Sequence, residues 1–426
     1  MRRTTLGVAI SLASCLLLGA TTATAATRFA EPTGSGPEPC VTNDPCPLPL
    51  AVDGPGVSDS DIVVIRSGSY TLSAPLAINH AITVRSPTLQ AATISYTTTG
   101  LFQDAVSVNN GGAVLQGVAI FATGPGGALR VSTGRAEWVV ARSSGSRGTC
   151  LPGVGTAPRL RDSVCHATGS NGIAVDITAG CPGGAQPQDT SLLRNVTAVA
   201  TGLNGVGMSM DLSSGCNIAY DALNVIAQGI AADLRAVTDA DPDTQATITM
   251  ANSSFDTVSE QGPGASITAP GTGANITEAP AFVAPGDFHQ ARGSPTIDAG
   301  AVDGHTGLAD IDGQAREQGE GIDIGADETL VPDTVLIKRP PKRQTTKRKR
   351  VNARFKFTSN AFTGDTPTFE CKLDKRAYKP CKSPRDYRVK SGGGKGKRHV
   401  FRVRATMVGG TDATPAKWRW RVKRTR

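Results

Sequence analysis

Short stretches of the chain alternate strictly between large apolar residues and polar or small ones. In residues 172–177, Ile173, Val175 and Ile177 fall on one side of an extended chain, whereas Ala174 and Asp176 fall on the other. Residues 207–212 and 229–234 repeat this hexapeptide pattern. A period of two predicts short strands with one buried face.

A second motif precedes each of these hexapeptides. It begins as Leu-Arg-Asp-Ser-Val at 160–164 and Leu-Arg-Asn-Val at 193–196, each followed by Ala-Thr-Gly, with weaker copies at 115–118 and 223–225. The spacing varies between about 21 and 35 residues, within the range of solenoid repeats. One coil cannot bury its apolar face alone, so coils must stack. We therefore predict consecutive β coils, with Ile173 and Ile230 in a common interior.

The last part of the chain alternates in a different way. Phe355 and Phe357 are flanked by basic residues, as are Phe401 and Val403, and the stretch 418–423 reads Trp-Arg-Trp-Arg-Val-Lys. Such strands have one buried and one solvated face. The pattern predicts a second, small β domain over residues 353–426 whose tryptophans face the core.

Charge separates the two parts. Residues 27–335 contain no lysine and have 13 Arg against 31 acidic residues, a net −18, whereas residues 336–426 have 29 basic against 5 acidic residues, a net +24. The tail is therefore expected to bind anionic partners. Because residues 331–352 are rich in Lys, Arg and Pro, we predict an extended, self-repelling linker there.

The first 26 residues have the features of a secretory signal: a basic start, an apolar stretch and the sequence Ala-Thr-Ala at 23–25. Cleavage after Ala25 or Ala26 is predicted. The alternative is a lipoprotein box at 12–15 with Cys15 lipidated. No later segment approaches the ~20 apolar residues of a membrane span. We expect an extracellular protein, either secreted or associated with the cell surface.

Eight further cysteines fall in local pairs, and disulfides are their expected state in an exported chain. The spacings match no common zinc motif, so metal ligation is the weaker alternative. Cys181 and Cys216 each follow a hexapeptide Asp by five residues, which predicts a bridge between successive coils. The expected pairs are Cys40 with Cys46, Cys150 with Cys165, Cys181 with Cys216, and Cys371 with Cys381.

On these repeats, the body resembles the right-handed parallel β-helix superfamily, the pectin-lyase-like solenoids. Residues 46–50 and 61–72 are similar to the first coil of secreted bacterial members, although the prolines argue against the usual capping helix. Residues 293–328 resemble a C-terminal segment described as a choice-of-anchor domain, and the tail resembles immunoglobulin-like modules of secreted actinobacterial proteins. The resemblance implies an all-β chain: a right-handed parallel β-helix over 27–330 with caps at both ends, followed by a small immunoglobulin-like β-sandwich.

Two groups of acidic residues are candidates for chemistry. Asp176, Asp211 and Asp233 occupy equivalent hexapeptide positions and are the candidate catalytic residues, with Ca²⁺ as the alternative means of offsetting their repulsion. The plainer interpretation makes each a solvated residue beside a turn. Asp310, Asp312, Asp323 and Asp327 could bind Ca²⁺ or form part of a cap over the last coil. No other cofactor is expected, and His166 is interpreted as structural.

These features support two functions. The first is a non-catalytic surface or matrix protein, a monomer, whose basic module docks on an anionic polysaccharide or cell-wall polymer through Arg402, Arg404, Arg419, Arg421 and Lys423. Nucleic acid is a weaker candidate, because the tryptophans face the core. The second is a lyase or glycoside hydrolase acting on acidic, uronic-acid glycans, as in many members of the superfamily. Lysine cannot be the base in a body without lysine.

Overall fold

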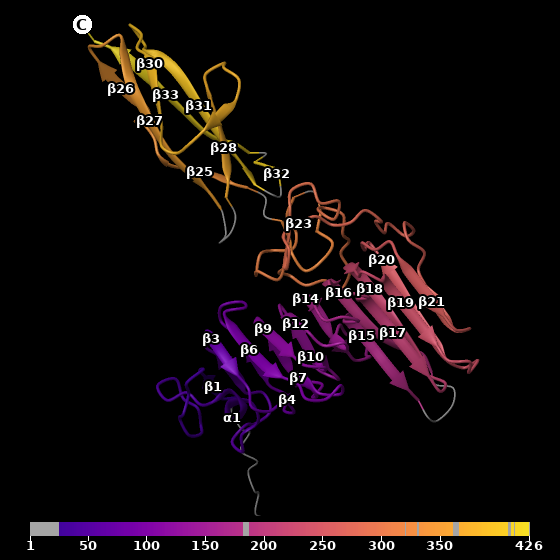
Figure 1. Ribbon diagram of the computed structural model, residues 1–426. Helices are drawn as coiled ribbons and strands as arrows, with labels where there is room; N and C mark the ends of the chain where they lie inside the picture. Colours follow the sequence, from indigo (N-terminus) through magenta and orange to yellow (C-terminus); the bar gives the residue numbers. More distant parts are fainter. Residues whose placement is uncertain are drawn as a thin grey trace, which may run out of the picture.

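The computed structural model describes residues 25–181, 187–319, 321–329, 332–360, 366–407, 410–412 and 414–425. It has a solenoid, a lateral segment (residues 280–319 and 321–329) packed along the solenoid, and a C-terminal β domain that projects away from both (Figure 1). The predicted signal sequence and Cys15 lie outside the described residues, apart from Ala25 and Ala26. No helix in the described ranges is long and apolar enough to cross a membrane.

One wall of the solenoid is a sheet of eight parallel strands, one from each successive coil. In chain order its strands are β4 (Leu76–Ile78), β7 (Asp104–Val108), β10 (Gly127–Val131), β13 (Gly148–Pro152), β15 (Ile173–Gly180), β17 (Val206–Ser213), β19 (Ala232–Thr238) and β21 (Val258–Gln261).

The other walls belong to a second parallel sheet of fourteen strands. These are β1 (Thr27–Ala30), β2 (Ile62–Ile65), β3 (Gly68–Thr71), β5 (Thr83–Arg85), β6 (Ala92–Thr97), β8 (Val114–Gln116), β9 (Val118–Thr123), β11 (Arg135–Glu137), β12 (Val140–Ser143), β14 (Leu160–Ala167), β16 (Asp189–Ala200), β18 (Asn217–Gln228), β20 (Gln245–Ala251) and β22 (Ala265–Ile267). The N-terminal coils have two short strands in this sheet. From β14 onward one long strand takes their place, because β14 pairs with both β11 and β12.

The predicted coils are confirmed by the strand register. Leu115 is aligned with Ala136, which is aligned with Leu160, which is aligned with Leu193, and all four are almost completely buried. The coil length ranges from about 21 to about 33 residues, as the repeat spacing predicted. The fold class is thus the predicted one: an all-β parallel β-helix followed by a small β-sandwich.

The predicted alignment of the hexapeptides is wrong in detail. Val175 is aligned with Met208 and then with Leu234, so successive hexapeptides are displaced along the strand. Ile230 consequently lies in the turn before β19 and is 64% exposed, whereas Ile173 is 8% exposed. These two residues do not share an interior, although the coils stack as expected.

The first coil is closed by the short helix α1 (Leu48–Asp53), which the sequence argued against because of its prolines. A proline in the first turn is tolerated there, since its missing N–H has no partner within the helix. Leu48, Ala51 and Val52 of α1 are buried over the end of the solenoid. The Arg28 side chain, 1% exposed, donates from Nε to the Ala51 carbonyl oxygen at 3.0 Å.

The sequence predicted that this segment caps the last coil. The structure instead places the lateral segment along the outer face of the fourteen-stranded sheet. It contains a two-stranded sheet of β23 (Phe282–Ala284) and β24 (Asp287–Gln290). Residues 299–311 run back across successive coils, as hydrogen bonds pair Asn252 with Ala299, Asn224 with Ala301, Arg161 with His305, Trp138 with Ala309 and Gln90 with Ile311. The segment thus fastens coils to one another.

The C-terminal domain is a sandwich of two sheets. One contains β25 (Thr334–Lys338), β27 (Arg350–Ser359) and β30 (Arg385–Lys390). The other contains β26 (Arg343–Thr346), β28 (Thr368–Leu373), β29 (Lys379–Cys381), β31 (Lys397–Met407), β32 (Gly410–Thr411) and β33 (Ala416–Arg424). Phe355 from the first sheet and Phe401 from the second stack at 3.9 Å between ring centroids, in one core with Trp420.

The residues predicted to form a linker belong to this sandwich. β25 pairs with β27, and β26 pairs with β33, so the domain begins at about residue 332 and not at 353. Leu336 of β25 packs against the core. All four predicted disulfides are present, with Cα–Cα distances of 4.9, 5.9, 5.1 and 5.8 Å.

Candidate functional site

The three candidate catalytic aspartates do not form a row. Asp176 is aligned with Ser209 and then Arg235, whereas Asp211 is aligned with Thr178. Asp233 lies further back, in β19 before the aligned residue Leu234. Because no two of these carboxylates face each other across adjacent coils, the stacked ladder is not formed. The rungs are offset, which was the alternative to a bound Ca²⁺.

Asp176 is the one member of the group in a distinctive environment. Its side chain is 2% exposed on the outer face of the eight-stranded sheet, and the Thr178 hydroxyl donates to Oδ2 at 3.0 Å. Oδ1 has no hydrogen-bond partner among the described residues. Burial raises the pKa of the carboxyl to about 6, against the lowering effect of Arg147 and Arg235. Asp211, by contrast, is exposed.

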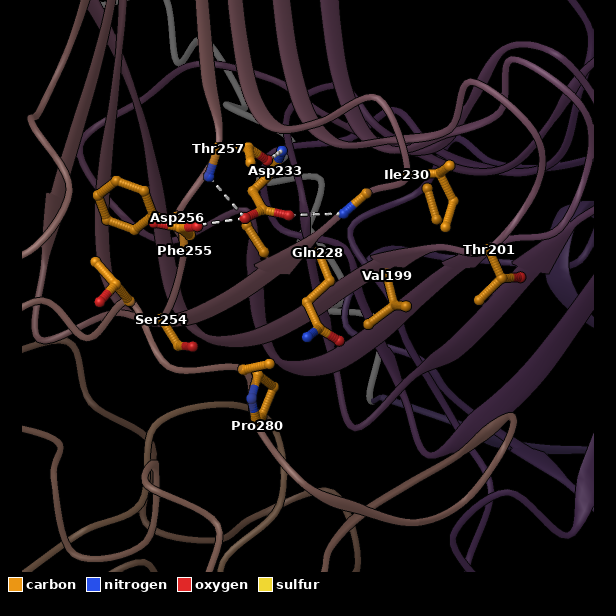
Figure 2. Close-up of a pocket in the computed structure, with 15 residues that line it drawn as sticks. Val199, Thr201, Gln228, Ile230, Asp233, Ser254, Phe255, Asp256, Thr257 and Pro280 are labelled. Carbon is orange, nitrogen blue, oxygen red and sulfur yellow. Dashed lines mark hydrogen bonds between the residues drawn. The ribbon is translucent and has the colours of Figure 1, made fainter.

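Asp233 organises a turn. It lies at the wall of a cavity of about 370 Å³, and its two carboxylate oxygens point at backbone amides (Figure 2). Oδ1 accepts a hydrogen bond from Gly229 N–H at 2.9 Å, and Oδ2 accepts from Asp256 and Thr257 N–H at 2.8 and 3.0 Å. A carboxylate already occupied in this way is poorly placed to act as a base, which supports the plainer interpretation of this residue.

A different polar row does cross the coils, and the sequence analysis missed it. Asp162, Asn195 and Asn224 occupy the corner of successive coils with positive φ angles of 48°, 55° and 56°. Asn195 donates to Asp162 and Asn224 donates to Asn195, each at 2.8 Å. All three are completely buried. The repeats carry the signal, since they read Leu-Arg-Asp and Leu-Arg-Asn at equivalent positions, but apolar alternation alone does not reveal it.

The four aspartates considered as possible calcium ligands or as part of a cap fall into two groups. Asp310 and Asp323 are fully buried and accept backbone hydrogen bonds, Asp310 from Gln314 and Glu328, and Asp323 from Asp298 and Thr329. These hydrogen bonds hold the lateral segment in shape. Among the described residues, neither Asp310 nor Asp323 belongs to a group of converging metal-ligand atoms. Burial raises the pKa of Asp310 to about 7. Asp312 and Asp327 lie elsewhere, close to His289, a residue that the sequence analysis did not consider.

The polyanion-binding residues predicted in the tail share one surface. We define the basic face as the outward side of the sheet formed by β26, β33, β31 and β28. Its cations are Arg343, Lys372, Arg398, Arg402, Lys417, Arg419, Arg421 and Lys423. Register places Arg398 opposite Arg421, Arg402 opposite Lys417, and Arg343 beside Arg421. Within the described ranges, none of these eight residues is in a salt bridge.

Arg404 is the one predicted member whose charge is compensated. Its Nε and Nη2 atoms donate to Glu370 Oε2 at 2.9 and 2.7 Å, and its guanidinium lies 4.3 Å from the Tyr378 ring centroid. Trp420 is 1% exposed, and Arg339 covers the Trp418 ring at 3.9 Å. Trp420 belongs to the core and Trp418 packs against it, so the prediction that these two tryptophans face the core is confirmed.

Comparison with known proteins identifies a similar solved structure but no family. No protein-family model matches the chain, and no curated protein matches it. Among solved structures, the A-module of a mannuronan C-5 epimerase from Azotobacter vinelandii is similar, with 9% sequence identity, a TM-score of 0.17, and coverage of 51% of this chain and 91% of that chain.

Proposed function

We propose that the protein is a secreted, non-catalytic surface or matrix protein whose C-terminal domain docks on an anionic polymer through the basic face. The supporting observation is the register of β31 against β33, which puts like charges directly opposite each other. Such pairs destabilise a sheet by up to about 1 kcal/mol each. A bound row of negative charges relieves that repulsion.

The electrostatics of the basic face agree with this interpretation. The pKa of Lys417 is lowered chiefly by Arg419, and further by desolvation, Arg402 and Arg398, so the cations act on one another. They are spread over four adjacent strands, which lie about 4.8 Å apart. A flat lattice of positive charge fits an extended polymer better than a single small ligand.

The covered tryptophans narrow the class of polymer. Single-stranded nucleic acid is commonly bound by bases stacking on exposed aromatic rings. On this domain Trp420 is buried, and the Tyr378 ring is contacted by the cationic groups of Arg404 and Lys372. We therefore favour an acidic polysaccharide or an anionic cell-wall glycopolymer, recognised by charge.

The test compares two variants of equal net charge. In the first, Arg402, Arg419, Arg421 and Lys423 of the basic face are replaced by Gln. In the matched control, four exposed cations of the opposite sheet, Arg350, Lys356, Arg388 and Lys390, are replaced by Gln. On immobilised polygalacturonate at low salt, we expect the first variant to bind at least tenfold more weakly than the parent and to elute at lower salt. The control should change binding much less. Equal losses in both variants would show that only net charge matters, and would refute docking by this face.

The runner-up is an enzyme that cleaves acidic glycans, and the observation in its favour is Asp176. A buried carboxyl with a pKa of about 6, influenced by Arg147 and Arg235, has the features of a general acid. An enzyme would release unsaturated or reducing sugars from uronic-acid polymers and lose that activity on Asp176→Asn. We expect no release from the parent protein, measured by absorbance of unsaturated uronates and by a reducing-sugar assay.

A further inference from the structure

Three side chains of the lateral segment form a cluster that the docking proposal does not use. His289 of β24, Asp312 and Asp327 each place a ligand atom within 4.8 Å of the others. His289 Nε2 lies 2.8 Å from Asp312 Oδ2. The three residues come from separate parts of the segment, so its folding brings them together. A nitrogen and two carboxylates form a donor set suited to a divalent metal ion.

A carboxylate orients the His289 imidazole, as is common for histidines that bind a metal. Asp287, two residues before His289 on the same face of β24, hydrogen-bonds His289 Nδ1 through Oδ1. A carboxylate on one ring nitrogen fixes the tautomer and leaves the other nitrogen to the metal. With the proton on Nδ1, the lone pair of Nε2 is directed to the side where Asp312 lies.

Asp327 supplies a carboxylate that lacks a full set of partners. Its side chain is 5% exposed, and Oδ2 accepts one hydrogen bond, from Gln290 N–H at 2.7 Å. Among the described residues no hydrogen bond reaches Oδ1. A carboxylate oxygen without a donor, close to His289 and Asp312, is a position that a cation would satisfy.

The cluster borders an open space. His289 and Asp312 also line a cavity of about 460 Å³ between the lateral segment and the outer face of the fourteen-stranded sheet. Its far wall contains Phe121 and Arg142, whose guanidinium lies 5.6 Å from the Phe121 ring centroid. A metal bound by the three side chains would therefore have protein on one side and an accessible space on the other.

We propose that His289, Asp312 and Asp327 bind a divalent transition-metal cation of the Zn²⁺ class, with Asp287 orienting the imidazole and a remaining coordination position facing the cavity. The histidine nitrogen favours such a metal over Ca²⁺, which takes oxygen ligands. The site differs from the predicted calcium cluster, because Asp310 and Asp323 are replaced by His289. It is independent of the basic face, so failure of one proposal leaves the other standing.

The competing interpretation is that no metal binds and that a doubly protonated His289 bridges Asp287 and Asp312 as an ion pair. The two interpretations differ in a direct measurement. Tag-free, full-length mature protein is stripped with a chelator, desalted and titrated with Zn²⁺ by calorimetry, with Mn²⁺ and Ca²⁺ titrated in parallel. We expect one Zn²⁺ per chain, weaker Mn²⁺ binding, Ca²⁺ weaker still, and a rise in melting temperature with Zn²⁺.

Variants locate the site. His289→Ala and Asp327→Asn should each weaken Zn²⁺ binding by at least tenfold and abolish the rise in melting temperature. The matched control is His80→Ala, because His80 is a surface histidine beside Asp53 and Asp59, at 3.5 and 4.0 Å. Among the described residues, the ligand atoms of these three side chains do not converge within 4.8 Å, as those of His289, Asp312 and Asp327 do. His80→Ala should leave Zn²⁺ binding unchanged.

Should His289→Ala misfold, Asp312→Asn, at a partly exposed side chain, serves as the second variant. Absence of stoichiometric binding by the parent, or binding unaffected by His289→Ala, overturns the proposal.

Discussion

At the scale of single residues, the coil corner occupied by Asp162, Asn195 and Asn224 restricts which residue types can be accommodated, because φ is positive there. The backbone there adopts a left-handed conformation that costs most residues roughly 1–2 kcal/mol, and Asn and Asp tolerate it best. The amide of Asn195 both accepts from Asn224 and donates to Asp162, so the row continues from coil to coil. Asn is suited to this place because its side chain carries a donor and an acceptor.

Asn195→Ala should therefore destabilise the protein by about 3 kcal/mol, from the cost of a left-handed Ala together with two unsatisfied buried partners. Asn204 is the matched control, with φ of 58° and a hydrogen bond to Asn171, but in an exposed turn. Asn204→Ala should cost only about 1 kcal/mol. Urea unfolding monitored by circular dichroism measures both. Equal costs would mean that the buried row contributes nothing beyond its backbone conformation.

His166 gives the solenoid a dependence on pH. Burial, and to a lesser degree Arg142, lowers the pKa of its imidazole from 6.5 to about 4. Above pH 6.5 the residue is neutral in both folded and unfolded chains. Between pH 6.5 and 4 the unfolded chain binds the proton and the folded chain does not, so stability falls as pH falls through this window, by on the order of 3 kcal/mol in total.

We expect His166→Phe to remove that part of the pH dependence while keeping a ring against Phe288, whose centroid lies 4.8 Å from the imidazole. The measurement is the free energy of unfolding of parent and variant at several pH values from 4 to 8. A parent and variant whose curves remain parallel across this window would contradict the assignment.

At the scale of elements, the sequence predicted which segments form strands better than it predicted how those strands align with one another. The strands β15 and β17 were both expected, yet Asp176 is aligned with Ser209 and not with Asp211. A shift of two residues leaves every side chain on the same face, so alternation cannot detect it. Turn lengths decide the register, and they vary from coil to coil. The Cys181–Cys216 bridge was still predicted correctly, because both cysteines lie just beyond strand ends that meet.

The same limit explains why the basic linker was predicted where strands exist. β25 is one short strand with Val335 and Ile337 exposed and Leu336 turned to the core, a pattern too brief to outweigh the charges that follow. The same limit applies to the candidate metal site, of which the sequence indicated only some residues. Asp312 and Asp327 could be selected by composition, whereas His289 joins them only through the path of the lateral segment, which no local pattern specifies.

The position of β25 has a direct consequence for the domain in isolation. A fragment of residues 332–426 should fold and show the near-ultraviolet dichroism of its buried tryptophan. A fragment of residues 339–426 lacks β25, which exposes the edge of β27 and removes Leu336 from a small core, so we expect a loss of about 3 kcal/mol or failure to fold. Thermal melts of the two fragments test this. Equal melting temperatures would place β25 outside the cooperative unit.

At the scale of the whole molecule, the two parts carry opposite charge, a net −18 for residues 27–335 and +24 for residues 336–426. The acidic body therefore competes with an anionic polymer for the basic face of the same chain. At low ionic strength this attraction should reduce the affinity of the full chain for an anionic polymer relative to the fragment 332–426. Screening weakens the competition, because the Debye length falls from about 10 Å at 0.1 M to about 3 Å at 1 M salt.

We accordingly expect the fragment 332–426 to bind polygalacturonate at least threefold more tightly than the full chain at low ionic strength, with the difference shrinking as salt is added, while both bind more weakly. Binding isotherms at several salt concentrations measure the two together, and the basic-face Gln variant of the fragment is the control that should lose the effect. If the full chain bound more tightly than the fragment at low salt, the body would be adding contacts to the polymer, and docking would belong to the whole molecule instead of the C-terminal domain alone.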